Sequence, residues 1–384
     1  MTVNRTPPPP LNPPERLLMG PGPSNPDPRV LTAMGMNPIG HLDPYFVELM
    51  DQTMGALRGV FQTTNHHTLP ISATGSAGLE AIMANLLESG DSCVVAVNGY
   101  FGLRLAELAR RAGADVRTVE AAPGDTVDPA AIEALLVERP AKVLAFVHAE
   151  TTTGACQSIP EMVSVARRHD ALVVVDCVTT LGGVPLDVDA MGIDAAGSCS
   201  QKCLGAPAGL GPITVGPRAM EAVRARKQPP ATWYLDFGLL FQYWGEPGGS
   251  PKRAFHHTAP IAAIYGFHEA LRLILEEGLD ARWARHQAAH EVLVRGLDVL
   301  GLSLFTPPAH RCSTINVIRT PDGIDEASVR ARLLTMGVEM GGGLGVLAGK
   351  VWRVGVMGHN AQTARIEQFL GALDAALRAE GYSA

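Results

Sequence analysis

The sequence predicts an α/β protein, with a mostly parallel seven-stranded sheet in a large domain and a smaller α+β domain at the C-terminus. Short apolar runs alternate with segments of helical periodicity between residues 69 and 215. Short strands joined by helical crossovers are typical of a parallel sheet covered on both faces. Hydrophobic residues make up 46% of the chain and charged residues 18%, which favours a well-buried globular fold. A chain of 384 residues is long enough for two domains.

The elements of the large domain follow one another in a regular order. Two helices come first, one from about residue 28 and one over 46–61. A short strand from residue 69 then leads through a small-residue turn into a helix that opens near Gly75 and Ser76. Strands are expected at 93–97, 115–119, 143–148, 171–175, 195–198 and 212–215, and helices at 102–112, 129–137 and 159–169. Ligands of such folds bind at the carboxyl ends of the strands, so the polar residues that follow the strands are the candidates for a site.

Composition and pattern divide the chain into three parts. Residues 1–16 are rich in proline and form an extended N-terminal arm, residues 17–275 form the large domain, and residues 276–384 form the small domain. The expected elements near and beyond the boundary are helices at 259–277, 279–300, 327–335 and 363–379 and strands at 303–305, 313–319 and 351–356.

Charge and composition exclude several classes of partner. The formal net charge is −7, so the sequence gives no electrostatic reason to expect a nucleic acid or an anionic membrane. No apolar run reaches the roughly 18 residues of a membrane span, and the N-terminus lacks the apolar core of a signal peptide. The six cysteines lack zinc-site spacing, which indicates free, mostly buried thiols in a reducing compartment. We therefore expect a cytoplasmic protein.

A lone lysine, Lys202, lies in a turn of small residues and glycines between two predicted strands, over residues 198–212. Poor solvation disfavours the charged form of a lysine, so its amine becomes available as a nucleophile. A lysine that forms a Schiff base needs that property. The pattern fits a surface lysine on a glycine-rich loop equally well, so the choice between a Schiff-base lysine and a surface lysine depends on the other candidate residues.

Two further candidates follow predicted strands. Thr74, Gly75 and Ser76 have the composition of a phosphate-binding turn, because backbone N–H groups at a helix start form an anion site. Such a turn also serves as an ordinary N-cap. Asp176 ends an apolar strand, where a carboxylate is costly unless it is paired. With Lys202 further along the chain, we expect Asp176 to pair with a pyridinium nitrogen rather than to cap the next loop.

Arg353 lies in a predicted strand among apolar neighbours. Its planar guanidinium matches a carboxylate bidentately, and either a substrate carboxylate or an internal ion pair with Glu or Asp would satisfy it. His256 and His257 suggest a metal at first sight, but adjacent residues point in different directions and no third ligand is evident. We therefore expect no metal site.

The lysine, the aspartate, the phosphate-binding turn and the arginine are together the parts of a pyridoxal-phosphate site. At these positions the chain resembles the class V aminotransferases of fold type I, in particular the alanine/serine–glyoxylate group. The resemblance covers nearly the whole chain in order. The matching stretches are 18–25, 61–65 with 68–69, 78–81, 150–154, 176 with 181–183, 192–194, 200–203 with 206–207, 256–258 and 349–353.

The resemblance implies a role for each matched residue. Lys202 would hold the cofactor as a Schiff base and move the proton between the substrate Cα and the cofactor C4′ atom, while Asp176 would keep the ring nitrogen protonated. Arg353 would bind the substrate carboxylate, with His41 and Phe255 beside the substrate, although His41 fits an ordinary loop histidine equally well. The residues implied to bind pyridoxal 5′-phosphate are Thr74, Gly75, Ser76, Phe101, Thr151, Asp176, Val178, Gln201, Lys202 and, from the second subunit of a homodimer, Thr258.

The same resemblance implies a transaminase that moves an amino group from alanine or serine to glyoxylate or pyruvate by a ping-pong course. Relatives that act on (S)-ureidoglycine carry amide side chains where this chain has His41 and Phe255, which disfavours that substrate because a missing hydrogen bond in a recognition site is heavily penalised. A cysteine desulfurase or related C–S lyase would need a mobile nucleophilic cysteine, and the late candidate, Cys312, directly precedes a predicted strand. A non-catalytic binding module would be expected to lose the lysine or the arginine.

Overall fold

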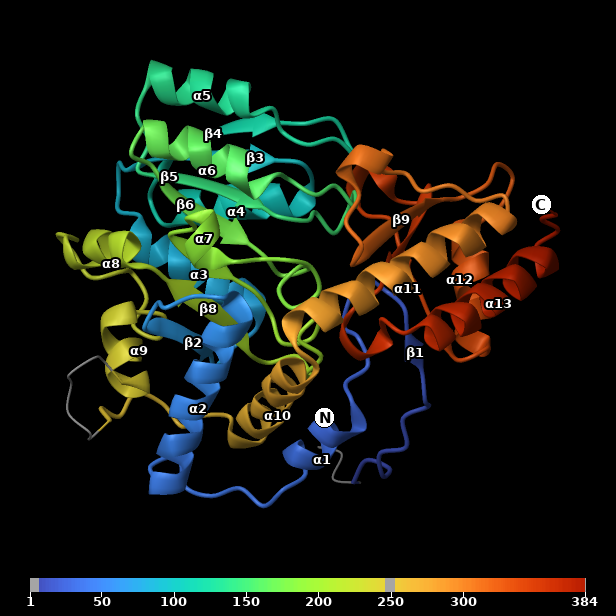
Figure 1. The fold of residues 1–384 in the computed structure, drawn as a ribbon, viewed down its shortest axis with the longest axis horizontal. Helices are drawn as coiled ribbons and strands as arrows, with labels where there is room; N and C mark the ends of the chain where they lie inside the picture. The colour runs from blue at the N-terminus through green and yellow to red at the C-terminus, as the bar shows by residue number, and fades with distance from the viewer. Residues whose placement is uncertain (1–6, 246–252, 384) are drawn as a thin grey trace, which may run out of the picture.

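The large domain is built on a seven-stranded sheet, seen in a computed structural model that describes residues 7–245 and 253–383 (Figure 1). Its strand order is β2–β8–β7–β6–β5–β3–β4. Only β8 runs against the others, since it pairs antiparallel with both β2 and β7 while all other neighbours pair parallel. The strands are β2 (His67–Ile71), β3 (Ser92–Val97), β4 (Asp115–Glu120), β5 (Val143–Val147), β6 (Leu172–Asp176), β7 (Ala195–Gly197) and β8 (Gly211–Val215). The prediction of a mostly parallel seven-stranded sheet is confirmed.

Helices cover both faces of this sheet. α3 and α4 pack together on one face, and α5 and α6 pack together on the other, as Figure 1 shows. α10 lies against α1 and α2 at one end of the sheet. The helices are α1 (Pro28–Met34), α2 (Pro44–Phe61), α3 (Gly75–Leu86), α4 (Tyr100–Arg111), α5 (Pro129–Glu138), α6 (Ile159–Arg168), α7 (Val188–Met191), α8 (Pro217–Arg224), α9 (Phe237–Trp244) and α10 (Ile261–Glu277).

Three of these helices begin in the same way. α1, α2 and α5 each start at a proline preceded by an aspartate, and the carboxylates of Asp27, Asp43 and Asp128 each accept the backbone N–H of the residue two positions later. Aspartate is a preferred N-cap, and proline at the first position lacks only an N–H that the helix does not use. This pair of residues starts α2 at Pro44, two residues before the expected start.

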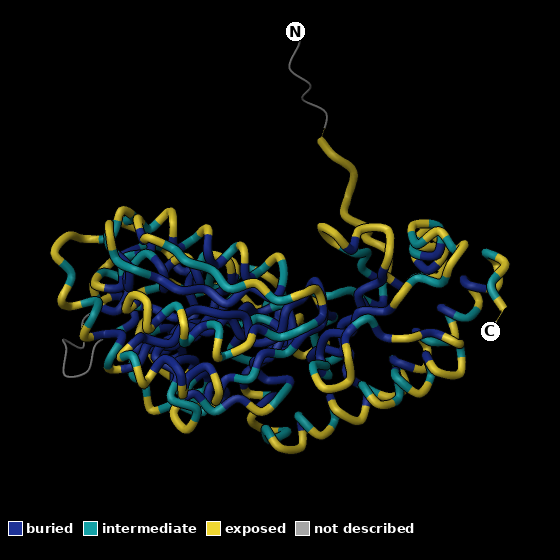
Figure 2. Tube along the Cα trace, turned by 90° about the horizontal axis from the view of Figure 1, so that it is seen from above, coloured by how far each residue is buried: buried dark blue, intermediate teal, exposed yellow. Residues whose placement is uncertain are grey.

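A second hydrophobic core lies in the C-terminal part of the chain, and Figure 2 shows its buried residues as a patch apart from the buried sheet of the large domain. A three-stranded antiparallel sheet, β11–β12–β9, carries three helices. The elements are α11 (Leu279–Val299), β9 (Ile315–Arg319), α12 (Glu326–Thr335), β10 (Val338–Glu339), β11 (Gly341–Gly342), β12 (Val351–Gly355), α13 (Thr363–Ala379) and the 3₁₀ turns Pro308–His310, Gly345–Leu347 and Gly358–Asn360.

The segment at the start of the predicted large domain packs with the small one. β1 (Leu17–Leu18) pairs parallel with β10, and Leu17 and Met19 are buried in the second core. Residues 7–16 precede it without regular structure and are largely exposed, as Figure 2 shows, while residues 1–6 of the predicted arm lie outside the described residues. The division into an arm and two domains at residues 16 and 275 stays a prediction.

The expected strand at 303–305 is wrong. Leu304 forms only an isolated bridge with Ile318, although Phe305 N–H donates to Val317 O. Pro307 and Pro308 follow at once, and because proline has no N–H to donate, pairing along β9 stops there.

Among the described residues, no helix is long and apolar enough to cross a membrane. All six cysteines are free, and all but Cys156 are buried.

Candidate active site

Lys202 is a buried residue in the turn that joins β7 to β8. This turn folds back on itself, because Ser200 N–H donates to Leu210 O and Ala206 N–H donates to Ser200 O. The Lys202 side chain is 8% exposed, and its Nζ atom lies 3.4 Å from Thr151 Oγ1. Burial lowers the pKa of the Lys202 amine, which favours the neutral nucleophilic form. The alternative of a surface lysine is wrong.

The N-terminal loop that follows β1 closes over the lysine turn. Ser24 N–H donates to Gln201 O at 2.9 Å, and Ser24 Oγ donates to Lys202 O at 3.0 Å. Asn25 Oδ1 accepts from Leu18 N–H and from the Asn360 side-chain amide, so the same loop is tied to the small domain. This packing explains why the stretch 18–25 is dense in glycine, proline and small polar residues.

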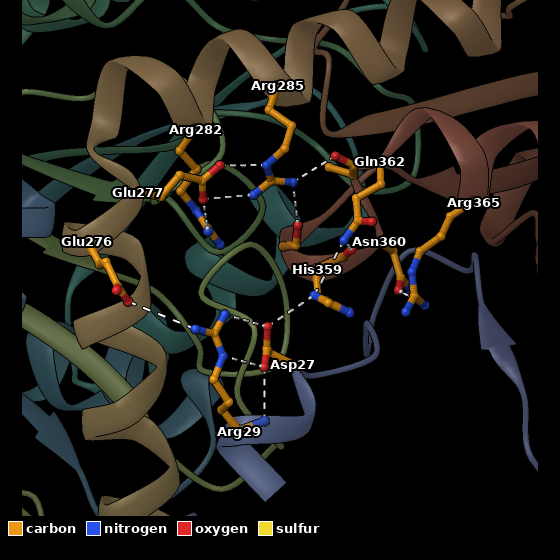
Figure 3. Close-up of polar contacts among 12 residues, drawn as sticks. Asp27, Arg29, Glu276, Glu277, Arg282, Arg285, His359, Asn360, Gln362 and Arg365 are labelled. Carbon is orange, nitrogen blue, oxygen red and sulfur yellow. Dashed lines mark hydrogen bonds and ion pairs between the residues drawn. The ribbon is translucent and has the colours of Figure 1, made fainter.

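A network of ion pairs around Glu277 supports the lysine turn (Figure 3). Arg282, which is 6% exposed, donates to Cys203 O at 2.6 Å and pairs with Glu277 at 2.8 Å. Arg285 pairs with the same carboxylate and donates to Gly358 O in the small domain. In Figure 3 the two guanidinium groups converge on Glu277 from α11. The residue after Lys202 is therefore linked, through Arg282, Glu277 and Arg285, to the backbone at Gly358.

Asp176 ends β6 with a carboxylate that is 2% exposed. Its Oδ1 atom accepts Val178 N–H at 2.9 Å, and its Oδ2 atom accepts from Arg104 Nη2 at 3.2 Å. Burial raises the pKa of the Asp176 carboxyl, whereas the charges of Arg104 and Lys202 and the Val178 N–H lower it. The carboxylate therefore caps the following loop through one oxygen and keeps the other next to a cation.

The turn Thr74–Ser76 lies at the N-terminus of α3. Thr74 is the N-cap residue, yet its side chain makes no capping hydrogen bond, so the backbone N–H groups of Gly75 and Ser76 stay available to an anion, whereas Ala77 N–H donates to Thr74 O. A Cβ atom on Gly75 would lie 2.6 Å from the Cβ atom of Cys199 and 2.7 Å from Ser198 O. Only glycine allows the turn to lie this close to the lysine turn, and the ordinary N-cap alternative is not supported.

Arg353 lies on β12 of the small domain and is 8% exposed. Its Nε atom donates to Gly342 O at 2.7 Å, and within residues 7–245 and 253–383 it forms no ion pair. Burial lowers the pKa of the Arg353 guanidinium. An arginine without a carboxylate partner in a buried position is ready to bind one from a ligand. The alternative of an internal ion pair is wrong for the described part of the chain.

One cavity of about 300 Å³ brings most of the predicted site residues together. The predicted residues that line it are Thr74, Gly75, Ser76, Phe101, Thr151, Val178, Gln201, Lys202 and Arg353. Asp176 adjoins the cavity through its bonds to Val178 and Arg104. Pro21, Gly22, Cys199 and Leu344 line the rest of it together with Arg104.

Three predicted residues lie elsewhere on the chain. The rings of His41 and Phe255 are 5.7 Å apart, Phe255 is 66% exposed, and Thr258 is exposed as well. None of the three lines the cavity around Lys202. His256 and His257 bond to each other at 2.7 Å, and no group of three or more candidate metal ligands occurs in the part of the chain that the structure describes.

Two residues of the site were not found from the sequence. Glu150 is fully buried, accepts the N–H groups of Phe101 and Gly102 and thereby fixes the start of α4. Its motif, residues 150–154, matches the family, but the pattern alone gives this carboxylate no role. Arg104 lies three residues after Phe101 on the same helix, and that spacing places both side chains on one face. The spacing was the signal that could have revealed Arg104.

The residues present fit pyridoxal phosphate. The α3 N-terminus offers uncapped backbone N–H donors to a phosphate group on the wall of the cavity that Lys202 also lines. A nucleophilic lysine, a buried carboxylate and an unpaired arginine complete the set that such a cofactor and an amino acid substrate require.

Comparison with known proteins finds relatives that match nearly the whole chain. The family model described as "Aminotransferase class-V" matches residues 29–368. An (S)-ureidoglycine–glyoxylate transaminase from Bacillus subtilis (strain 168) is 37% identical over an alignment 383 residues long, gaps included, which covers 95% of this chain and 91% of that protein. An alanine–glyoxylate aminotransferase from Callithrix jacchus is 38% identical over 371 residues, covering 96% of this chain and 89% of that protein.

The structural comparison is equally extensive. The crystal structure of an alanine–glyoxylate aminotransferase from Nostoc sp. superposes with a TM-score of 0.94 at 46% identity, covering 98% of this chain and 100% of that chain.

Proposed function

The chain belongs to the class V aminotransferases, with the fold type I architecture expected from its sequence, and from this premise we propose that it transfers the amino group of alanine or serine to glyoxylate. It is a pyridoxal-phosphate-dependent transaminase. The observation that carries the proposal is that a buried lysine and an unpaired arginine, Lys202 and Arg353, line one cavity. Such a pair can hold an amino acid by its carboxylate next to a nucleophilic amine.

The side chains around the cavity divide the chemistry among them. Bound pyridoxal phosphate supplies an aldehyde that accepts the amino group and a ring that withdraws electrons from the substrate Cα atom. Lys202, with its pKa lowered by burial, is suited to take the proton from Cα and to return one during the reverse half of the cycle. Thr151, whose Oγ1 atom lies 3.4 Å from Lys202 Nζ, orients that amine.

Asp176 and Arg353 carry the charges that complement the cofactor ring nitrogen and the substrate carboxylate. Asp176 offers a carboxylate to a protonated ring nitrogen, and because the carboxylate is buried it favours that proton strongly. Arg353 binds the carboxylate of the amino acid in one half-reaction and of the keto acid in the other. Pro21, Gly22 and Leu344 also line this cavity of about 300 Å³ and add no charged group to it, which suits small substrates such as glyoxylate, alanine and serine.

We propose further that the active protein is a homodimer. His41, Phe255 and Thr258 lie outside the cavity of their own chain, yet the family resemblance assigns them to the site. Around them several large apolar side chains are exposed, among them Leu42 at 56% and Tyr45 at 67%. A second copy that covers this face would bury those side chains and bring Thr258 to the phosphate end of the partner's cavity.

Ureidoglycine is the second candidate donor, because a relative of 37% identity carries that name. His41 and Phe255 argue against it, since a phenylalanine offers no hydrogen bond to a ureido group. A C–S lyase is disfavoured by Cys312, which is buried and bonds to Thr314 Oγ1 instead of lying on an exposed loop.

Separate half-reactions test the proposal. Purified protein loaded with pyridoxal phosphate is mixed with alanine, serine, glycine or ureidoglycine, and the visible absorbance of the bound cofactor is followed. We expect rapid loss of the band with alanine or serine and its return on addition of glyoxylate, with no change in the Lys202→Ala variant. A response to ureidoglycine alone would assign the second function, and no response to any donor would refute both.

A further inference from the structure

Arg104 lines the cavity around Lys202, although no role is yet assigned to it. It lies on α4, one helical turn after Phe101, and its guanidinium carbon lies 4.6 Å from the centre of the Phe101 ring. Glu150 fixes the start of this helix by accepting Phe101 N–H and Gly102 N–H. The guanidinium is therefore presented to the cavity from a rigid element.

The guanidinium bridges the two ends of the cofactor site. Its Nη1 atom donates to Ser76 Oγ at 3.0 Å, next to the anion-binding turn, and its Nη2 atom donates to Asp176 Oδ2 at 3.2 Å. Its Nε atom is buried and has no partner in the described part of the chain. Two of the five N–H donors of the guanidinium are used in these bonds, so this planar group, held between a hydroxyl and a carboxylate, has donors left for a further anion.

The anion-binding turn otherwise lacks a full positive charge. Thr74, Gly75, Ser76 and Gln201 are neutral, and the helix N-terminus contributes only a partial charge. The other cations that line the cavity are Lys202, whose amine lies beside Thr151, and Arg353, which is bonded to Gly342 in the small domain. A phosphate dianion moved from water into such a cavity requires a compensating charge.

We propose that Arg104 is a further cofactor-binding residue, whose guanidinium neutralises the phosphate at the Ser76 end and holds the Asp176 carboxylate for the ring nitrogen. This inference rests on the proposed function only through the identity of the cofactor. One residue thus serves both ends of the same small molecule, which a lysine could not do because an ammonium is a single point charge.

The environment of Asp176 supports the second half of this role. Burial raises the pKa of its carboxyl, and the Arg104 charge is the largest of the effects that lower it. Without Arg104, the carboxyl would keep its proton more readily and lose its attraction for a protonated ring nitrogen.

Binding measurements on the cofactor-free protein test the proposal without reference to turnover. The Arg104→Gln and Arg104→Lys variants are compared with wild type for pyridoxal phosphate, for pyridoxal, which lacks the phosphate, and for inorganic phosphate as a competitor. Arg110→Gln is the matched control, since Arg110 lies on the same helix with its side chain 48% exposed. Thermal unfolding and circular dichroism establish that each variant is folded.

We expect Arg104→Gln to weaken pyridoxal phosphate binding about 10- to 100-fold, the range of one or two charge-assisted hydrogen bonds, with a smaller loss for pyridoxal and weaker competition by inorganic phosphate. Arg104→Lys should restore most of the phosphate-dependent part, and Arg110→Gln should bind like wild type. Unchanged affinity in a folded Arg104→Gln protein would overturn the proposal. So would equal losses for pyridoxal phosphate and pyridoxal, because Arg104 would then act on Asp176 alone.

These results are independent of the substrate assignment. If the wild-type protein binds pyridoxal phosphate but transfers no amino group from any donor, the proposed function fails while the comparison of Arg104 variants still decides the role of Arg104. If the wild-type protein does not bind pyridoxal phosphate, both proposals fail together.

Discussion

Gly22 lies directly against the side chain of Lys202. A Cβ atom on Gly22 would be 3.0 Å from both the Cγ and the Cε atoms of the lysine, and Gly22 has a φ of +117°, which side-chain-bearing residues rarely adopt. The glycine therefore sets the space in which the lysine can move.

Gly22→Ala should weaken cofactor binding several-fold and lower the free energy of unfolding by about 1–3 kcal/mol, because the new methyl group strains the backbone and displaces the lysine. Cofactor titration and urea unfolding measure the two effects. Gly90→Ala is the control, since Gly90 has a φ of +86° and a Cβ atom there would meet no atom within 4 Å. The free energy of unfolding of this variant should fall, while its cofactor affinity should stay at the wild-type value. Wild-type cofactor affinity in Gly22→Ala would contradict the argument.

The buried amine of Lys202 should make stability of the cofactor-free protein depend on pH. Its folded pKa lies below the ordinary value of 10.5 because of burial, so between these two values the unfolded chain binds more protons than the folded one. The resulting destabilisation is complete below the folded pKa and vanishes above 10.5. Lys202→Met should therefore be more stable than wild type at neutral pH, with a difference that shrinks as the pH rises. Urea unfolding at several pH values checks this, and a constant difference would contradict it.

Arg353 should act on both substrates alike. Arg353→Lys keeps the charge but loses the bidentate geometry, so the KM values of the amino donor and of glyoxylate should both rise about 10- to 100-fold, while cofactor binding stays unchanged. Steady-state kinetics with each substrate varied in turn provides the measurement. Arg319→Gln on the neighbouring strand, where Arg319 is exposed, should leave both KM values as they are. A rise for only one substrate would show that Arg353 does not bind the shared carboxylate.

Glu277 should contribute more to the free energy of unfolding than its exposed neighbour Glu276. Glu277→Gln leaves Arg282 and Arg285 close together without their shared carboxylate, and we expect a loss of about 1–3 kcal/mol, less than for a fully buried pair because Glu277 is partly exposed. Glu276→Gln is chemically identical, with a side chain that is 58% exposed, and should be nearly neutral. Urea unfolding of the two variants decides. Equal effects would mean that the network in Figure 3 contributes nothing specific.

The sequence predicted those parts of the site that follow from local pattern. Lys202 and Asp176 follow predicted strands, and Arg353 lies within one, so the topology of a parallel sheet places the first two at one edge. The pairing of Arg104 with Asp176 spans 72 residues, and no local periodicity reveals such a contact. The same holds for Leu17 and Met19, whose burial depends on a partner strand near residue 338.

Thr258 should act on the cavity of the other subunit. Lys202→Ala and Thr258→Ala proteins are each expected to be impaired, the first in catalysis and the second in cofactor binding. In a mixed dimer, the chain that keeps Lys202 would receive the intact Thr258 of its partner, so one complete site forms if Thr258 works across the interface. If Thr258 served its own chain, every site in the mixed dimer would carry a defect.

Co-refolding of differently tagged Lys202→Ala and Thr258→Ala chains, followed by tandem purification, isolates the mixed dimer for assay. We expect it to recover about half of the wild-type activity and one tightly bound cofactor per dimer, because mixing restores a site without any new contact. Failure to form a dimer during the tandem purification would refute the homodimer itself. A mixed dimer as inactive as its parents would place Thr258 outside the neighbouring site, and its exposure on the chain surface would then need another explanation.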